Sequence, residues 1–130
     1  MAWDRRIVAR LLIVDDEQPI LDSLAIALTA AGHEVRTAAD GIVALRVFRE
    51  APADLVLTDI VMPGQDGLGF LMEIKRDFPT VPIIAMSGGI TNSPLYLKMA
   101  AQLRARRILQ KPFPLEQIQQ AVAEALGSSR

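Results

Sequence analysis

Short apolar runs alternate with amphipathic segments along most of the chain. The apolar runs predict five strands, at Ile7–Val14, His33–Ala38, Leu55–Thr58, Val81–Met86 and Arg107–Gln110. Between them, apolar residues recur at the three- and four-residue spacing of a helix, as at Ile20, Leu24 and Leu28. The helices expected run from Pro19 to about Ala31, after Asp40 through Phe48, from Gly67 to about Phe78, from Ser93 and Pro94 to about Leu103, and over Pro114–Leu126.

This regular βα repetition predicts a parallel sheet covered by helices on both faces. Right-handed crossovers limit the possible topologies. We therefore expect an α/β fold of the flavodoxin-like, doubly wound (βα)5 kind, with a five-stranded parallel sheet of order 2-1-3-4-5. The short apolar segment Leu55–Thr58 is typical of a strand buried on both faces.

Several single residues indicate where the helices begin and end. Pro19 suits the first turn of a helix, because its missing N–H has no helical partner there. Gly32 is expected to end that helix, and Asp40 is expected to cap the next one. His33 is the chain's one histidine, so we interpret it as structural or solvent-facing.

Length and composition exclude several classes of protein. A chain of 130 residues predicts one domain over 1–130, with no output domain. The absence of cysteine excludes thiol catalysis and disulfides. The net charge of −1 provides no global field for nucleic acid, and no apolar run approaches the ~20 residues of a membrane span. The N-terminal residues lack the apolar core of a signal peptide, so a cytoplasmic protein is expected.

Polar side chains stand where the expected strands end, namely Asp15, Asp16, Asp59, Ser87 and Lys111. In an open parallel sheet, ligands bind beyond the carboxyl ends of the strands. Asp16 and Asp59 can supply hard oxygen ligands to Mg²⁺, and Asp15 can act directly or through water. A backbone carbonyl past Asp59 is a further candidate ligand. The pattern therefore predicts a divalent cation site.

The same residues suit phosphoryl transfer. With a metal bound, Asp59 becomes a credible nucleophile that would form an aspartyl phosphate. Lys111 can neutralise one phosphoryl oxygen as a compact charge, and Ser87 can donate a hydrogen bond to another. Taken alone, an acidic residue at a turn is often only a helix cap, and a Ser before two glycines can be turn chemistry.

Four motifs in this order resemble the receiver domain of two-component response regulators, over nearly the full length of the chain. They are Val14-Asp-Asp-Glu17, Asp59-Ile-Val-Met-Pro-Gly64, Ser87-Gly-Gly89 and Lys111-Pro-Phe113. Since no helix-turn-helix or catalytic segment follows these motifs in the sequence, we expect a stand-alone, single-domain receiver, with a fragment of a longer regulator as the alternative. Its output would act in trans on an unknown downstream protein, or the phosphoryl group would be relayed onward.

The resemblance also implies a role for each matched position. Asp59 would accept a phosphoryl group from a histidine kinase or a histidine phosphotransfer protein. Asp15 and Asp16 would hold Mg²⁺ with Asp59, helped by the backbone carbonyl of Val61. Ser87 and Lys111 would contact the phosphoryl group. A monomer is expected, with pairing on phosphorylation as the alternative, and neither direct binding of nucleic acid nor membrane insertion is expected.

Three positions bear on how closely the chain follows the family pattern. A cis peptide before Pro112 is frequent in the family and would direct Lys111 into the site. Ile108 stands where many receivers have an aromatic residue, so the resemblance does not extend to the usual hydroxyl–aromatic switch. Arg104 replaces a common glycine, so the preceding helix needs another kind of capping.

Two other functions fit parts of the pattern. A phosphorylation-independent interaction module could keep the receiver shape, although crowded carboxylates argue against it. An aspartate-nucleophile phosphatase of the haloacid dehalogenase type would need a second Asp two residues after the nucleophile. That position is Val61, which cannot transfer a proton, so we expect a signalling protein and not an enzyme.

Overall fold

The computed structural model describes residues 9–59, 67–87, 101 and 104–127. The strands in this part are β1 (Arg10–Val14), β2 (Glu34–Ala38), β3 (Leu55–Asp59), β4 (Ile83–Ser87) and β5 (Arg107–Gln110). The helices are α1 (Gln18–Ala30), α2 (Gly41–Glu50), α3 (Gly67–Asp77) and α5 (Leu115–Gly127). The further helix expected from Ser93 to about Leu103 lies outside the described residues, apart from Ala101, which is helical.

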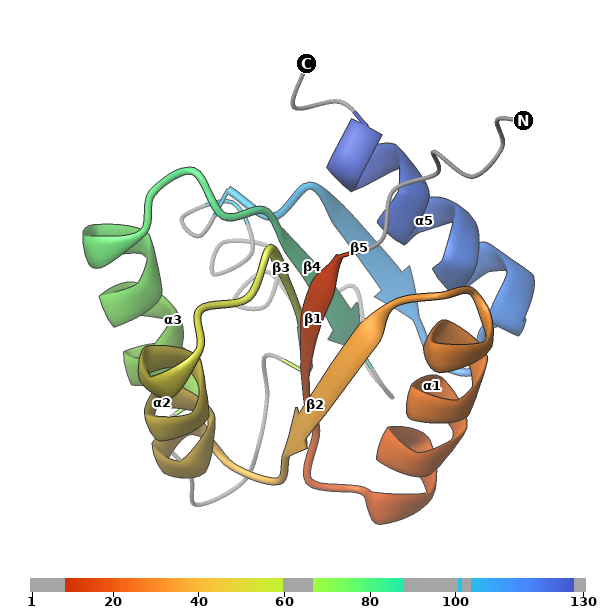
Figure 1. Cartoon of the computed structure of the whole chain (residues 1–130), viewed down its shortest axis with the longest axis horizontal. Helices are drawn as coiled ribbons and strands as arrows, with labels where there is room; N and C mark the ends of the chain where they lie inside the picture. Colours follow the sequence, from red (N-terminus) through yellow and green to blue (C-terminus); the bar gives the residue numbers. More distant parts are fainter. Residues whose placement is uncertain (1–8, 60–66, 88–100, 102–103, 128–130) are drawn as a thin grey trace.

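The strands form one parallel sheet in the order β2-β1-β3-β4-β5 (Figure 1). Helices α1 and α5 cover one face, and α2 and α3 cover the other (Figure 1). The predicted doubly wound architecture and strand order are therefore confirmed. The order makes β3 the central strand, and all five of its residues are buried.

Alternating side chains along the strands divide the core into two layers. On one face, Leu12, Val14, Val56 and Ala85 pack in a cluster that includes Phe48 of α2 and the α3 residues Phe70, Leu71 and Ile74. On the other face, strand residues pack with the buried residues of α1 and α5; this cluster includes Ile13, Leu57, Met86, Leu109, Leu24, Leu28, Ile118 and Val122. Each helix thus buries one apolar stripe, which is what the three- and four-residue spacing predicts.

The local signals of the sequence are confirmed at three helix ends. Asp40 is the N-cap of α2, and its side chain accepts a hydrogen bond from the backbone N–H of Val43 at 2.8 Å. Pro19 lies in the first turn of α1. Gly32 follows the end of α1 with φ of 101°, a left-handed conformation that glycine adopts without a steric penalty.

Strand boundaries differ by one to three residues from those the apolar pattern predicts. The largest difference is at β1, which begins at Arg10, whereas the apolar run predicts a start at Ile7. β3 and β4 each continue into the polar residue that follows the apolar run, because Asp59 pairs with Met86 and Ser87 pairs with Gln110. β4 begins at Ile83 rather than Val81, and Pro82 has no N–H to give to the ladder. The N–H of Val81 instead bonds the carbonyl of Phe78 in a turn.

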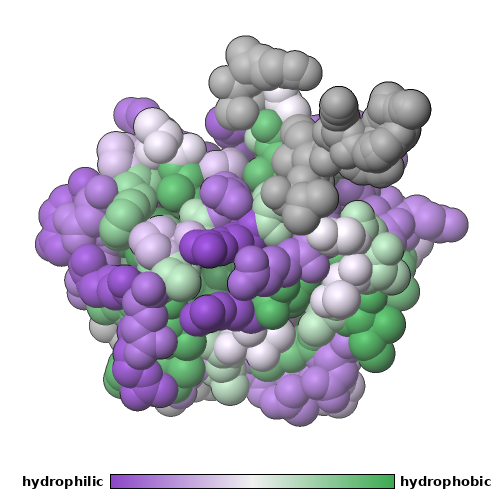
Figure 2. All heavy atoms as spheres, viewed as in Figure 1, coloured by the Kyte–Doolittle hydropathy of each residue, from purple (hydrophilic) through white to green (hydrophobic). Residues whose placement is uncertain are grey.

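The described surface is mixed in character. Hydrophilic and hydrophobic residues are interspersed on the face shown in Figure 2. The large apolar side chains with the greatest exposure stand on separate helices, Ile26 on α1, Ile42 on α2 and Met72 on α3. Single exposed apolar residues of this kind are normal on soluble domains. Among the helices described, none combines the length and apolar character that crossing a bilayer requires.

Candidate functional site

The register of the sheet brings residues from neighbouring strands to one edge. Val14 of β1 pairs with Thr58 of β3, so Asp15, the next residue, stands level with Asp59. Asp59 in turn pairs with Met86 of β4. The carboxylates of Asp15 and Asp59 are therefore neighbours because strands one and three are neighbours in the sheet.

The same register places Ser87 and Lys111. Ser87 follows Met86, the partner of Asp59, and pairs with Gln110 of β5. The N–H of Lys111 donates to the carbonyl of Ser87 at 2.7 Å, which extends the ladder by one bond. The backbone of Lys111 is thus fixed to β4, and Ser87 is itself buried, with 3% of its surface exposed.

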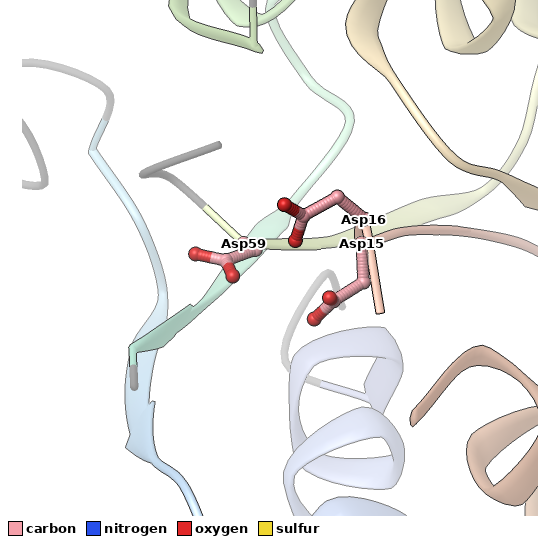
Figure 3. A group of neighbouring side chains, drawn as sticks. All are labelled: Asp15, Asp16 and Asp59. Carbon is pink, nitrogen blue, oxygen red and sulfur yellow. The ribbon is translucent and has the colours of Figure 1, made fainter. Parts of the chain in front are cut away.

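Three carboxylates gather at the ends of β1 and β3 (Figure 3). Each of Asp15, Asp16 and Asp59 offers an oxygen, and these oxygens lie within 4.8 Å of one another. Asp15 is 0% exposed and Asp59 is 7% exposed, whereas Asp16 is open to solvent. The structure therefore brings together the acidic residues that the sequence singled out.

Lys111 is the cation of this cluster. Its Nζ lies 2.6 Å from Oδ2 of Asp15 and 3.0 Å from Oδ2 of Asp59. Burial acts to lower the pKa of Lys111, but the hydrogen bonds and charges of these two carboxylates outweigh burial and raise the pKa above its ordinary value. The ammonium is thus charged throughout the physiological pH range.

Glu17 is a site residue to which the sequence analysis gave no role. Its Oε1 lies 3.2 Å from Nζ of Lys111, and its backbone N–H donates to Oδ1 of Asp15 at 2.9 Å. The available signal was its place at the end of the first motif, directly after Asp15 and Asp16. A pattern of apolar residues cannot reveal the role of Glu17, because Glu17 is polar and its partner Lys111 is 94 positions away in the sequence.

Three further predictions concern the peptide before Pro112, the side chain at Ile108 and the carbonyl of Val61. The peptide between Lys111 and Pro112 is cis, as expected. Ile108 lies on β5 with 42% of its surface exposed, so an aliphatic side chain does occupy this place. Val61, whose carbonyl was a candidate metal ligand, lies outside the described residues, as does the segment that follows Ser87 up to position 100.

The oxygen donors of the cluster match the ligands that small divalent cations prefer. Asp15, Asp16 and Asp59 all present carboxylate oxygens, the hard ligands that Mg²⁺ takes in proteins. The described part of the cluster holds four acidic side chains and one ammonium, with Asp15, Asp59 and Glu17 in contact with Lys111, so it has an excess of negative charge. These residues fit a small, hard cation and the charged oxygens of a phosphoryl group.

A family comparison agrees with this chemistry. The sequence model described as "Response regulator receiver domain" matches residues 11–123. The DNA-binding transcriptional regulator NtrC of Azospirillum brasilense is 36% identical over 121 residues, covering 93% of this chain and 25% of the relative. The probable chemotaxis protein CheY of Rhizobium etli is 32% identical, covering 92% of this chain and 93% of the relative.

Solved structures give the same result. A crystal structure of NtrX from Brucella abortus in complex with ATP matches with a TM-score of 0.85 and 34% identity, over 95% of this chain and 28% of that one. A CheY-like receiver domain protein from Methanospirillum hungatei matches with a TM-score of 0.86 and 27% identity, over 94% and 96% of the two chains. The chain spans about a quarter of the length of the NtrC regulators and most of the length of the CheY-like proteins.

Proposed function

Because the chain belongs to the response regulator receiver domain family, we propose that Asp59 accepts a phosphoryl group from a phosphohistidine on a partner protein. The phosphorylated chain then changes its affinity for a downstream protein. Receiver domains are generally non-enzymatic signalling modules of two-component systems. The proposal therefore concerns which residue is modified and what surrounds it.

The position of Asp59 is the observation that carries this proposal. Its carboxylate stands at the end of the central strand, lies beside two other carboxylates and is bonded to the ammonium of Lys111 at 3.0 Å. A nucleophile needs partners that neutralise the charge which develops in transfer, and this site supplies them. An acidic residue that merely capped a helix would not need a buried cation beside it.

The proposed step is a displacement at phosphorus. An oxygen of the Asp59 carboxylate forms the new O–P bond while the N–P bond of the phosphohistidine breaks. The ring nitrogen keeps the bonding electron pair and takes up a proton from solvent. Such transfer depends mainly on in-line positioning and on neutralisation of charge, so few covalent groups are required.

The other residues position and neutralise the phosphoryl group. Asp15, Asp16 and Asp59 would hold Mg²⁺, with the carbonyl of Val61 as a further proposed ligand; the cation, when bound, offsets charge on the phosphoryl oxygens. We assign to Lys111 a contact with one phosphoryl oxygen, and to the hydroxyl of Ser87 a hydrogen bond to another. Support for both roles comes from their place at the ends of the two strands beyond β3.

The partners follow from the family. A histidine kinase or a histidine phosphotransfer protein would supply the phosphoryl group. The relatives include both long transcriptional regulators and a chemotaxis protein of similar length. The prediction that residues 1–130 form a receiver without an output domain is tested by neither kind of match and stays a prediction, as does the monomeric state.

Incubation with acetyl phosphate and Mg²⁺, followed by intact mass measurement, tests the proposal. The carboxylate of Asp59 displaces acetate from the small donor, so we expect a mass increase of one phosphoryl group. Asp59→Asn should abolish it. Asp54→Asn is the matched control, because Asp54 precedes the same strand at its opposite end and its side chain accepts a hydrogen bond from the backbone N–H of Arg10.

The outcome separates the competing functions. An unmodified wild-type protein, or an adduct that survives Asp59→Asn, would contradict phosphorylation of Asp59 and favour a phosphorylation-independent module. Turnover of a small phosphate ester that depends on Asp59 would instead indicate a phosphatase.

A further inference from the structure

We propose that Glu17 is a positioning residue that restrains the ammonium of Lys111 and thereby slows phosphorylation of Asp59. The inference rests on the proposed function, since it concerns the rate of that reaction. Its basis is the arrangement of carboxylates around Lys111, which assigns a partner to every proton of the ammonium.

A lysine ammonium has three N–H donors and accepts no hydrogen bond. Here Nζ of Lys111 lies 2.6 Å from Asp15, 3.0 Å from Asp59 and 3.2 Å from Glu17. All three donors are therefore engaged. A phosphoryl oxygen on Asp59 can receive a hydrogen bond from Lys111 only when one of these contacts is given up.

Glu17 is the partner that can leave at the lowest cost. Asp15 is 0% exposed and makes the shortest of the three contacts, and water cannot reach its carboxylate to replace the ammonium. Asp59 is the acceptor and must stay near the ammonium. The side chain of Glu17 is 59% exposed and makes the longest of the three contacts, so water can replace Lys111 around it.

Helix capping does not explain where the side chain of Glu17 lies. It is the N-cap residue of α1, a position where a side chain commonly accepts a hydrogen bond from the first turn of the helix. Its side chain makes no such bond. The carboxylate instead reaches across to Lys111, so its placement is explained by the ion pair and not by helix capping.

The surroundings leave room for the carboxylate to move. Glu17 and Lys111 line a groove of about 560 Å³ between the start of α1 and the segment from Pro112 to Leu115. A released Glu17 can therefore turn toward solvent without displacing a packed side chain. While it remains in place, its negative charge also repels an incoming phosphoryl donor.

The test compares rates of phosphorylation by acetyl phosphate at saturating Mg²⁺. In Glu17→Gln, the competing charge is gone, and we expect the rate to rise about three- to tenfold at low salt, as removal of one nearby charge can give. The gain should shrink toward equality at about 1 M NaCl, where charges are screened within roughly 3 Å. Glu17→Ala, which also removes the carboxylate, should show the same gain and the same dependence on salt.

Asp22→Asn is the matched control. Asp22 lies on the same helix, is exposed and bonds Gln18 rather than Lys111. Its rate should stay within about twofold of the wild type, because a single exposed charge has little effect at a distance.

Three other results would overturn either this inference or the proposed function. Glu17→Gln that is as fast as or slower than the wild type, with the adduct still on Asp59, would overturn this inference and leave the proposed function intact. An equal acceleration in Asp22→Asn would overturn it too, because the effect would then be a general field. Failure of the wild type to form any adduct would overturn the proposed function itself.

Discussion

Lys111 balances carboxylates that burial would otherwise make costly. Asp15 and Asp59 are both buried, and an ionised carboxylate without a partner in such a place destabilises the fold. Because the pKa of Lys111 is raised, the stability that its charge contributes is present below pH 10.5 and is lost only as the pH rises through the higher, folded value. The ammonium therefore adds no pH dependence near neutrality.

His33 is the residue for which a pH effect is expected. Its Nδ1 accepts a hydrogen bond from the backbone N–H of Ala9 at 3.2 Å, which only a nitrogen without a proton can do. Burial lowers the pKa of His33 below 6.5 in the folded protein. The stability that neutral His33 contributes is thus present above pH 6.5 and is lost as the pH falls through the folded pKa.

We therefore predict that His33→Gln reduces the pH dependence of stability in weak acid. Urea unfolding of the wild type should show a free energy of unfolding that falls as the pH drops below 6.5. The loss should not exceed the ~1 kcal/mol of one hydrogen bond. The Gln variant should show a flatter profile there, because its amide does not titrate. Parallel profiles for the two proteins would contradict the role of His33.

At the level of elements, the sequence was sufficient to predict the order of the strands and of the four helices that the structure describes. The exact residues at which strands end were harder to predict from the sequence, because they depend on pairing with a neighbouring strand. The hydropathy pattern predicts Asp59 and Ser87 to be loop residues, yet strand pairing in the sheet continues through both. Arg104 shows the same limit. The expectation of another kind of capping there is wrong, because Arg104 itself takes the left-handed conformation of a glycine, with φ of 54°.

Strand β5 offers a matched pair for testing how the sheet is stabilised. Leu109 is 1% exposed and belongs to the core layer beneath α1 and α5, whereas its neighbour Ile108 is 42% exposed. Leu109→Ala should lower the free energy of unfolding by about 2–5 kcal/mol through lost burial and a cavity. Ile108→Ala should lower it by about 1 kcal/mol or less, because much of that side chain is already in water.

Urea unfolding of both variants checks this prediction. Equal losses would show that the outer face of β5 is covered as fully as its inner face.

For the whole molecule, the site is a product of topology. Four strands contribute to it, and the order β2-β1-β3-β4-β5 alone places Asp15, Asp59, Ser87 and Lys111 at one edge. This is why strand-end residues could be predicted together from the sequence. The contact between Glu17 and Lys111 could not be predicted, because it depends on the reach of two side chains, one from the N-cap residue of α1 and one from the residue after β5, and not on register.

A cluster that exists only when these strands are assembled should couple cation binding to folding. Mg²⁺ that binds the folded chain and not the unfolded one stabilises it by RT ln(1 + [Mg²⁺]/Kd), about 1.4 kcal/mol at a tenfold excess over Kd. We therefore expect MgCl₂ to raise the urea midpoint of the wild type above that in NaCl of equal ionic strength.

Asp16→Asn should lose most of this shift, since it removes a candidate ligand that is exposed and packs in neither core layer. Asp22→Asn should keep the shift, because Asp22 is not in the cluster. An equal response of all three proteins to both salts would mean that the carboxylates of Asp15, Asp16 and Asp59 hold no specific cation, and that the excess charge of the site is balanced by Lys111 and screening alone.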